Sequence, residues 1–148
     1  MKRIIGRIDK ADFPLLNLFD VEIKIDTGAY TSSIHCKNVK VEDNSLKCNF
    51  LDEEHPNYHE KEIIFDNYAV KDIKSSNGQT ETRYRILTEI TLFGQTYPIF
   101  LTLSDRIEMR YPVLLGRKFL SRKFNVDTNK SKPILYKENF RSRNKAQA

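Results

Sequence analysis

Apolar and polar residues alternate along most of this chain, which is the pattern of strands with one buried face. Ten segments have this character, and they are Arg3–Ile8, Val21–Ile25, Ser33–Lys40, Ser45–Leu51, Lys61–Phe65, Tyr68–Lys74, Thr80–Thr88, Glu89–Leu92, Thr96–Leu103 and Val113–Leu115. Helical periodicity is scarce, and only residues 116–122 are expected to form one or two helical turns. Many short strands and one short helix predict a compact all-β barrel.

Three segments between these strands predict turns or loops. Asn77-Gly78 separates two runs of strand-forming residues, and this dipeptide favours a tight hairpin turn. Phe93-Gly94-Gln95 joins two further alternating strands, the second of which contains Pro98. Because proline has no N–H to donate, that part of the strand is expected at an edge or a bulge. Residues 52–59 are expected to form an exposed acidic loop.

The composition describes one globular unit. A chain of 148 residues with 39% hydrophobic residues suits a single domain with its own core. No apolar run approaches the length of a membrane helix, and the N-terminus is too quickly polar for a signal peptide, so we expect a cytoplasmic location. In that reducing compartment Cys36 and Cys48 are expected to be free thiols.

Charge is distributed unevenly along the chain. From Arg117 onward ten Lys or Arg face two acidic residues, a net charge of +8 within a total of +5. We therefore expect a barrel domain over residues 1–128 and a basic tail over 129–148. The tail is either a solvated, disordered end or a segment attracted to RNA, ribosomes or acidic polypeptide. No RNA-binding motif is recognisable in it, so nucleic acid is expected as a partner only through ribosome association.

Asp26-Thr27-Gly28 directly follows the strand 21–25 and carries the candidate chemistry. Such a tripeptide can be a plain turn, in which Asp caps the backbone and Gly supplies conformational freedom. It can also be a loop that presents a carboxylate for catalysis. Far downstream, an apolar strand ends in Leu114-Leu115-Gly116-Arg117.

An Asp-Thr-Gly-Ala loop followed much later by two apolar residues and Gly-Arg resembles the retropepsin-like aspartic peptidases. Residues 26–35, 75–79, 101–106 and 114–117 resemble, in this order, a bacterial branch labelled as an ATP-dependent zinc protease. That branch is associated with the enzyme that glutamylates a ribosomal protein. The resemblance spans roughly residues 4–128 and implies a closed six-stranded acid-protease barrel with one short helix.

The resemblance also implies an aspartic endopeptidase that works as a homodimer. Two carboxylates about 3 Å apart share one proton, as in aspartic proteases, so that one acts as base and the other as acid. This chain has a single Asp-Thr-Gly, and the second carboxylate must therefore come from Asp26 of another copy on a two-fold axis. The competing hypothesis is a non-catalytic barrel that binds a ribosomal or acidic protein partner.

Further roles follow from the same resemblance. Thr27 would lock the paired loops, and Gly28 would let substrate backbone approach closely. Ala29, Thr31 and a hairpin tip at Ser75, Ser76, Asn77 and Gly78 would contact the substrate. Support for the catalytic loop would come from His35, Gly116 and Arg117.

The implied substrate is a glutamate-rich peptide, such as the tail of a ribosomal protein. Arginines that could bind its carboxylates are Arg83, Arg85, Arg106 and Arg110. Arg106 and Arg110 could instead form ordinary surface pairs with Asp105 and Glu108.

No metal or cofactor is expected. His35, Cys36, Cys48, His55 and His59 all fall between residues 35 and 59. The spacing of His55 and His59 could suit zinc, but Pro56 disfavours a helix that begins at His55. The chain has no His-Glu-x-x-His motif and no phosphate-binding Gly-Lys-Ser/Thr loop. Zinc and ATP therefore find no support in these residues.

Overall fold

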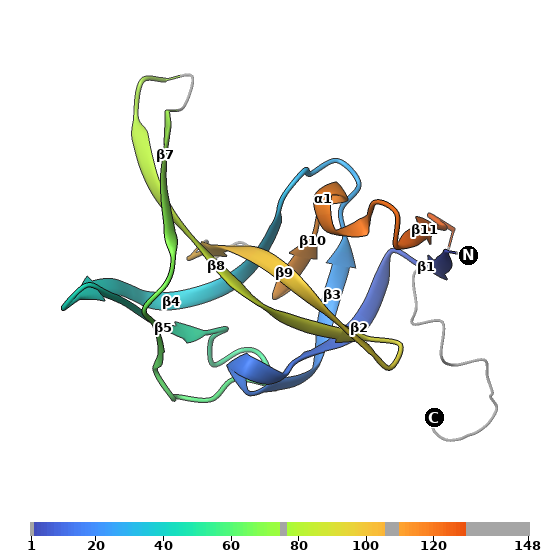
Figure 1. Cartoon of the computed structure of the whole chain (residues 1–148), viewed down its shortest axis with the longest axis horizontal. Coiled ribbons are helices and arrows are strands. Elements are labelled where there is room, and N and C mark those ends of the chain that lie inside the picture. The colour runs from blue at the N-terminus through green and yellow to red at the C-terminus, as the bar shows by residue number, and fades with distance from the viewer. Residues whose placement is uncertain (1, 75–76, 106–109, 130–148) are drawn as a thin grey trace.

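The computed structural model describes residues 2–74, 77–105 and 110–129. Six strands enclose the core, and they are β2 (Ile8–Phe13), β3 (Leu18–Ile25), β4 (Ser32–Glu42), β8 (Thr80–Leu92), β9 (Gln95–Ser104) and β10 (Val113–Leu115) (Figure 1). Their order around the sheet is β10-β3-β2-β8-β9-β4, and β4 pairs back onto β10. The closed six-stranded barrel expected from the sequence is therefore confirmed.

The short strand β10 closes this barrel and brings distant segments together. It runs parallel to β3, with Val113 opposite Ile23 and Leu115 opposite Ile25. On its other side it runs antiparallel to β4, where Val113 lies opposite Ile34. The end of β10 consequently lies beside the end of β3, where the Asp-Thr-Gly loop begins.

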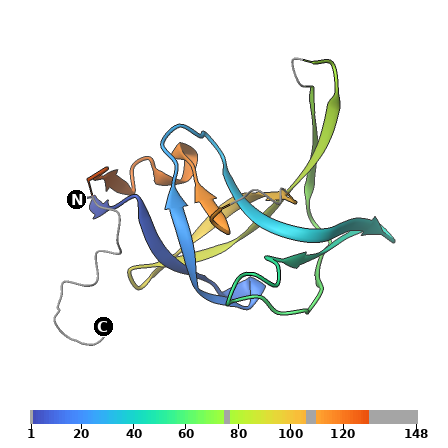
Figure 2. The same cartoon turned by 180° about the vertical axis from the view of Figure 1, so that it is seen from behind.

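The remaining elements extend or flank the barrel. They are β1 (Arg3–Ile5), η1 (Pro14–Leu16), β5 (Ser45–Phe50), β6 (Ile63–Phe65), β7 (Ala69–Lys74), α1 (Arg117–Leu120) and β11 (Phe124–Val126). Strands β5 and β6 continue the sheet from β4, while β1 and β11 form a separate parallel pair. Strand β7 pairs with the start of β8, and this hairpin projects beyond the barrel. In Figures 1 and 2 the hairpin and the loop that follows β3 both project toward the top of the view.

Period-2 alternation decides which side chains fill the barrel. In β3, Val21, Ile23 and Ile25 are buried, whereas the intervening Glu22 and Lys24 are exposed. The same alternation buries the residues of β8 and β9 that meet in the core, namely Ile86, Ile90, Leu92, Ile99, Leu101 and Leu103. None of the helices in the described part of the chain is long and apolar enough to cross a membrane.

Several local predictions are confirmed. Phe93 and Gly94 form the β8–β9 turn with φ values of 52° and 78°, the left-handed conformation that a tight hairpin turn requires. Pro98 lies at a local edge, because β4 pairs with β9 only from Leu101 onward. The short helix after Gly116 is also present as α1.

Some strand boundaries were predicted wrongly. The expected strand Arg3–Ile8 is divided between two elements, β1 and β2. Between them, at Gly6, the chain passes from the two-stranded sheet with β11 to the sheet of the barrel. The expected strands Thr80–Thr88 and Glu89–Leu92 form one 13-residue strand, β8. Strand β8 continues through Thr88 and Glu89 because both pair with β9. Strand β11 was not predicted, since its three residues are ordered by pairing with β1.

The acidic loop at residues 52–59 packs onto the barrel more than its composition suggested. The Asn57 side-chain amide donates to the Phe19 carbonyl oxygen at 2.6 Å. The His59 ring lies 3.1 Å from the Leu16 carbonyl oxygen, and Tyr58 packs against the core. Only part of this loop is therefore exposed, because these contacts attach it to η1 and β3.

Candidate active site

Asp26 is the first residue after β3 and begins a tight, well-bonded loop. Its backbone N–H donates to the Leu115 carbonyl oxygen at 2.8 Å, which continues the β3–β10 pairing by one residue. Its side-chain Oδ1 accepts the Gly28 N–H at 3.1 Å, and its carbonyl accepts the Ala29 N–H at 3.2 Å. These bonds orient a half-buried carboxylate at the end of a barrel strand.

Gly116 and Arg117 fix this loop and the residues that follow it through hydrogen bonds. The Arg117 N–H donates to the Ala29 carbonyl oxygen at 2.9 Å, and its guanidinium donates to the Thr27 carbonyl oxygen at 3.0 Å. The Gly116 N–H donates to the Ser32 hydroxyl oxygen at 3.0 Å in a buried position. Any Cβ at residue 116 would lie 2.5 Å from the Thr31 carbonyl oxygen, so only glycine fits there.

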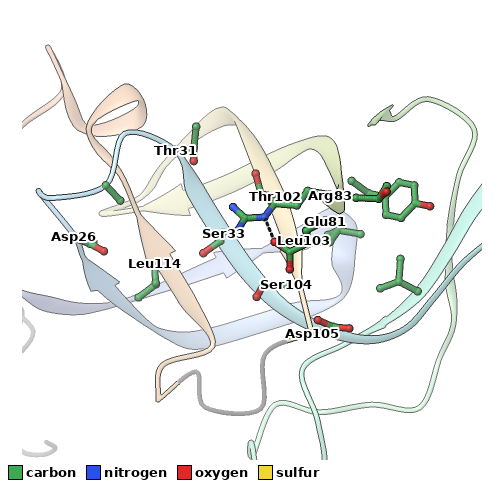
Figure 3. A pocket seen from close by; sticks show the side chains of 14 residues that line it. Asp26, Thr31, Ser33, Glu81, Arg83, Thr102, Leu103, Ser104, Asp105 and Leu114 are labelled. Atoms are coloured by element: carbon green, nitrogen blue, oxygen red, sulfur yellow. Dashed lines mark hydrogen bonds and ion pairs between the residues drawn. The ribbon is translucent and has the colours of Figure 1, made fainter. Parts of the chain in front are cut away.

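The Asp26 loop borders a cavity of about 420 Å³, which we call the Asp26 cavity (Figure 3). Asp26, Ala29 and Thr31 line it from the loop, and residues 81–84 line it from the β7–β8 hairpin. The other lining residues are Ser33, Val39, Thr102, Leu103, Ser104, Asp105 and Leu114. A volume of this size suits the side chains of a peptide that crosses the loop.

Carboxylates outnumber cations among the described residues of this cavity. Its lining includes Asp26, Glu81 and Asp105 but only one described cation, Arg83. The Arg83 Nε donates to Glu81 Oε1 at 2.8 Å, so this guanidinium is already engaged by an acid of its own strand (Figure 3). Any binding of acidic substrate by Arg83 would therefore compete with Glu81.

The described lining of the Asp26 cavity includes only some of the candidate residues. Ser75, Ser76 and Arg106 lie outside the described residues. Asn77 and Gly78 belong to the hairpin beyond the lining residues 81–84, where Gly78 has φ of 87° and Asn77 Oδ1 accepts the Gln79 N–H. The β8 side of the hairpin, residues 81–84, thus contributes to the described cavity.

Sequence reasoning did not name Ser32, Glu81 or Tyr84. Ser32 follows the Asp-Thr-Gly-Ala segment closely, and its hydroxyl could have been suspected as a partner for a nearby backbone group. The i,i+2 spacing of Glu81 and Arg83 in a predicted strand could likewise have indicated their pairing on one face.

Comparison with protein families agrees with this geometry. The family model described as "RimB-like: Retropepsin-like aspartic endopeptidase RimB" matches residues 4–135. The chain belongs to this RimB-like family.

Curated relatives of the RimB-like chain are named as ligases, not as peptidases. It is 37% identical over 134 residues to a probable alpha-L-glutamate ligase of Shewanella pealeana, covering 88% of this chain and 29% of that protein. A probable alpha-L-glutamate ligase of Desulfotalea psychrophila is 34% identical over 132 residues, which cover 85% of this chain and 28% of the relative. The chain therefore spans less than a third of the length of these curated relatives.

The fold of the RimB-like chain also occurs in a solved structure. The crystal structure of a protein of unknown function from Legionella pneumophila superposes with a TM-score of 0.66. The match covers 88% of this chain and 96% of the other at 24% identity, which shows that the two share a fold.

His35 belongs to a separate cluster of the RimB-like chain. Its ring is only 4% exposed, and its Nε2 lies 3.0 Å from Asp52 Oδ2. His55 Nε2 lies 3.8 Å from the other oxygen of Asp52. Partial burial by itself raises the pKa of the Asp52 carboxyl, but the Glu54 N–H and the His35 ring that bond to it lower this pKa below its ordinary value. The cluster thus ties the 52–59 loop to β4.

The two thiols lie beside this cluster and are free, as expected. Cys36 and Cys48 are both fully buried between β4 and β5. The hydrogen bond between them, together with burial, raises the pKa of the Cys36 thiol well above its ordinary value. Within the described ranges, no group of three or more His, Cys, Asp or Glu side chains is arranged to hold a metal ion.

Proposed function

We propose that this RimB-like chain is an aspartic endopeptidase that acts as a homodimer on glutamate-rich peptide segments. One observation carries the proposal. The Asp26 carboxylate borders a peptide-sized cavity, in a loop that β10, Gly116 and Arg117 hold in place. A plain surface turn would not need backbone and guanidinium bonds with Leu115 and Arg117, which lie about 90 residues downstream.

The proposed chemistry uses the two Asp26 carboxyl groups of a dimer. The ionised carboxylate takes a proton from water as the water oxygen bonds to the peptide carbonyl carbon. The protonated carboxyl gives its proton to the carbonyl oxygen, which forms a neutral gem-diol. The Asp26 that took the proton from water then gives it to the peptide nitrogen as the C–N bond breaks. The other Asp26 takes a proton from one hydroxyl of the gem-diol, so that the pair again holds one proton. Two carboxylates about 3 Å apart hold one proton between them, because the repulsion between two negative charges prevents both from being ionised.

Support for a glutamate-rich substrate comes from the relatives. They are named probable alpha-L-glutamate ligases, and the segment that matches this chain is less than a third of each. If a peptidase segment and a ligase that adds glutamate are joined in one polypeptide, we expect the peptidase to remove glutamate from the product of that ligase. A ribosomal-protein tail would be such a product, and the site of action would then be the cytoplasm.

Asp26→Asn tests the assignment of the carboxylate. The full chain is incubated with a peptide that ends in several glutamates, and cleavage is followed by mass spectrometry. We expect no cleavage by Asp26→Asn and normal cleavage by Asp43→Asn, a matched change in the distant β4–β5 turn. Circular dichroism of both variants checks the fold. Undiminished cleavage by Asp26→Asn would refute the role of Asp26.

Mixing the two forms tests the shared site. When excess Asp26→Asn is mixed with wild type under saturating substrate, most wild-type chains enter mixed dimers that hold one carboxylate. Activity should then fall in proportion to the dilution of wild-type pairs, whereas excess Asp43→Asn should not lower it. Activity that stays constant with Asp26→Asn would contradict a dimeric site.

The alternative is a non-catalytic barrel that binds an acidic protein partner. The observation in its favour is that each chain supplies a single Asp-Thr-Gly carboxylate. The same assay separates the two functions, because a binding module would retain the peptide without cleaving it in wild type and in Asp26→Asn alike.

A further inference from the structure

A second, smaller groove of about 120 Å³ lies beside the Asp26 cavity. Residues of β9 and α1 line it, together with Arg85 of β8, Thr31 and Ser32 at the start of β4, and Lys123 after α1. Three of its lining residues are cations, Arg85, Lys118 and Lys123, and its described lining contains no acid. We call it the cationic groove.

Two of these cations lie against the same aromatic ring, that of Phe100. The Arg85 guanidinium carbon lies 4.6 Å from the centre of the Phe100 ring, and the Lys118 Nζ lies 5.4 Å from the same centre. Phe100 is 44% exposed, so a ligand can reach both the ring and the charges. Phe100 lies opposite Leu87 and Arg85 opposite Thr102 in the β8–β9 ladder, which makes Arg85 and Phe100 diagonal neighbours.

The charges of this groove are not neutralised within the described part of the chain. None of the ion pairs between described residues involves Arg85, Lys118 or Lys123. Lys123 donates to the Phe119 carbonyl oxygen at 3.0 Å, which holds its charge at the groove. By contrast, Arg83 in the Asp26 cavity is paired with Glu81. Arg85, two residues further along β8, is the arginine that remains available for an external carboxylate.

The cationic groove adjoins the Asp26 cavity. Thr31 and Thr102 line both of them. Thr31 belongs to the loop that begins at Asp26, and the carbonyl oxygen of the neighbouring Tyr30 accepts the Lys118 N–H at 2.9 Å. A peptide backbone that crosses Asp26 would therefore have a neighbouring side chain within reach of the groove.

Charge then decides where an acidic side chain of such a peptide would bind. Carboxylates outnumber cations in the described lining of the Asp26 cavity, whereas the groove offers three cations and an apolar ring. A glutamate fits both features, because its methylenes can pack on Phe100 while an arginine fork binds its carboxylate. We infer that the cationic groove is a specificity subsite that binds a glutamate side chain of the substrate next to the cleaved bond, an inference that rests on the proposed peptidase function.

Binding by an inactive form tests this subsite without requiring cleavage. Full-length Asp26→Asn is titrated against a fluorescein-labelled peptide of alternating Ala and Glu, and against its Ala-Gln counterpart, by fluorescence anisotropy at low salt. Arg85→Gln and Lys118→Gln are added to this background. Lys10→Gln serves as the matched control, since it removes the same charge from β2, where Lys10 pairs with Asp20.

Arg85→Gln should weaken binding of the Glu peptide about 10-fold or more, the loss typical of one charge-assisted hydrogen-bonded contact. Lys118→Gln should weaken it by a smaller factor, and binding of the Gln peptide should change less than about 2-fold in either variant. Arg85→Lys should restore part of the affinity, because it keeps the charge without the fork. In the active chain, Arg85→Gln should raise KM for the Glu peptide with little change in kcat.

The outcomes separate this inference from the proposed function. If wild type cleaves peptide through Asp26 and Arg85→Gln leaves the ratio of Glu to Gln affinity unchanged, the subsite is refuted and the peptidase stands. If no peptide is cleaved but Glu-peptide binding depends on Arg85, the groove stands as a carboxylate site of a binding module. A phosphoserine peptide that depends on Arg85 more strongly than the Glu peptide does would overturn the assignment to glutamate.

Discussion

Replacing Gly116 by Ala should destabilise the protein, whereas the same change at Gly28 should not. The two glycines belong to the same loop assembly, but their surroundings differ. A Cβ at residue 116 would lie 2.5 Å from the Thr31 carbonyl oxygen and 2.8 Å from the Tyr30 carbonyl carbon. A Cβ at residue 28 would make one contact of 3.4 Å, with Asp26 Oδ1.

The expected magnitude follows from these distances. At residue 116 the obstacle is backbone, so the loop must move by about 1 Å to reach ordinary van der Waals separation, and overpacking of this kind costs about 1–3 kcal/mol. A loss of about 2 kcal/mol would lower the urea midpoint by about 1 M for a typical denaturant dependence. Gly28→Ala should be neutral or stabilising by up to about 1 kcal/mol, because it restricts the unfolded chain without a clash.

Urea unfolding of wild type, Gly116→Ala and Gly28→Ala, followed by circular dichroism, measures these differences. The stability result is independent of any enzymatic activity. If the peptidase proposal holds, Gly116→Ala should also lower kcat about 100-fold, since a shift of about 1 Å misplaces Asp26. Unfolding free energies of the two variants that agree within about 0.5 kcal/mol would refute the argument from close approach.

Three further outcomes are expected. Asp52→Ala should lose about 1–3 kcal/mol of unfolding free energy at neutral pH, because it leaves the buried His35 ring without its partner. The lowered pKa of Asp52 makes this contribution present above about pH 4 and lost as the pH falls through the folded-state value. The difference from wild type in pH-dependent urea melts should therefore disappear in acid, and Glu54→Ala in the same loop serves as the exposed control. Ser32→Ala should cost about 1–3 kcal/mol in the same melts, since the buried Gly116 N–H loses its acceptor, and an effect no larger than that of Ser33→Ala would contradict this. Cys36 and Cys48 should resist iodoacetamide in the native state and react after denaturation, and rapid native labelling in mass spectra would show that the β4–β5 interior is open.

Local chemistry along the chain was sufficient to predict much of this protein. Alternation in β3 and β9 indicated which side chains face the core, because the strand period of two leaves few choices. The Phe93-Gly94 turn was predictable because Gly94 adopts positive φ freely and lies between two alternating strands. The Asp-Thr-Gly loop and the Gly116-Arg117 pair were recognisable as one motif, and their contact was an expectation of that motif.

Element boundaries depended on partners rather than on composition. Strand β2 was only partly predicted, because Asp9 places a polar residue at one of its buried positions, and pairing with β3 stabilises the strand. The three residues of β11 form a strand because β1 lies beside them. Short segments of this kind have little intrinsic preference, so neighbouring strands decide their conformation.

The candidate site shows the same division. The sequence by itself determined that an Asp-Thr-Gly loop follows a half-buried strand and that basic residues gather toward the C-terminus. Only the tertiary structure decided that β10 lies between β3 and β4, and hence that Gly116 touches Thr31. It also decided that Arg85 joins Lys118 and Lys123 in the cationic groove, because these residues come from β8, α1 and the segment after α1. Residue spacing determines the face on which a side chain lies, but which faces meet depends on contacts between residues far apart in sequence, which no local pattern encodes.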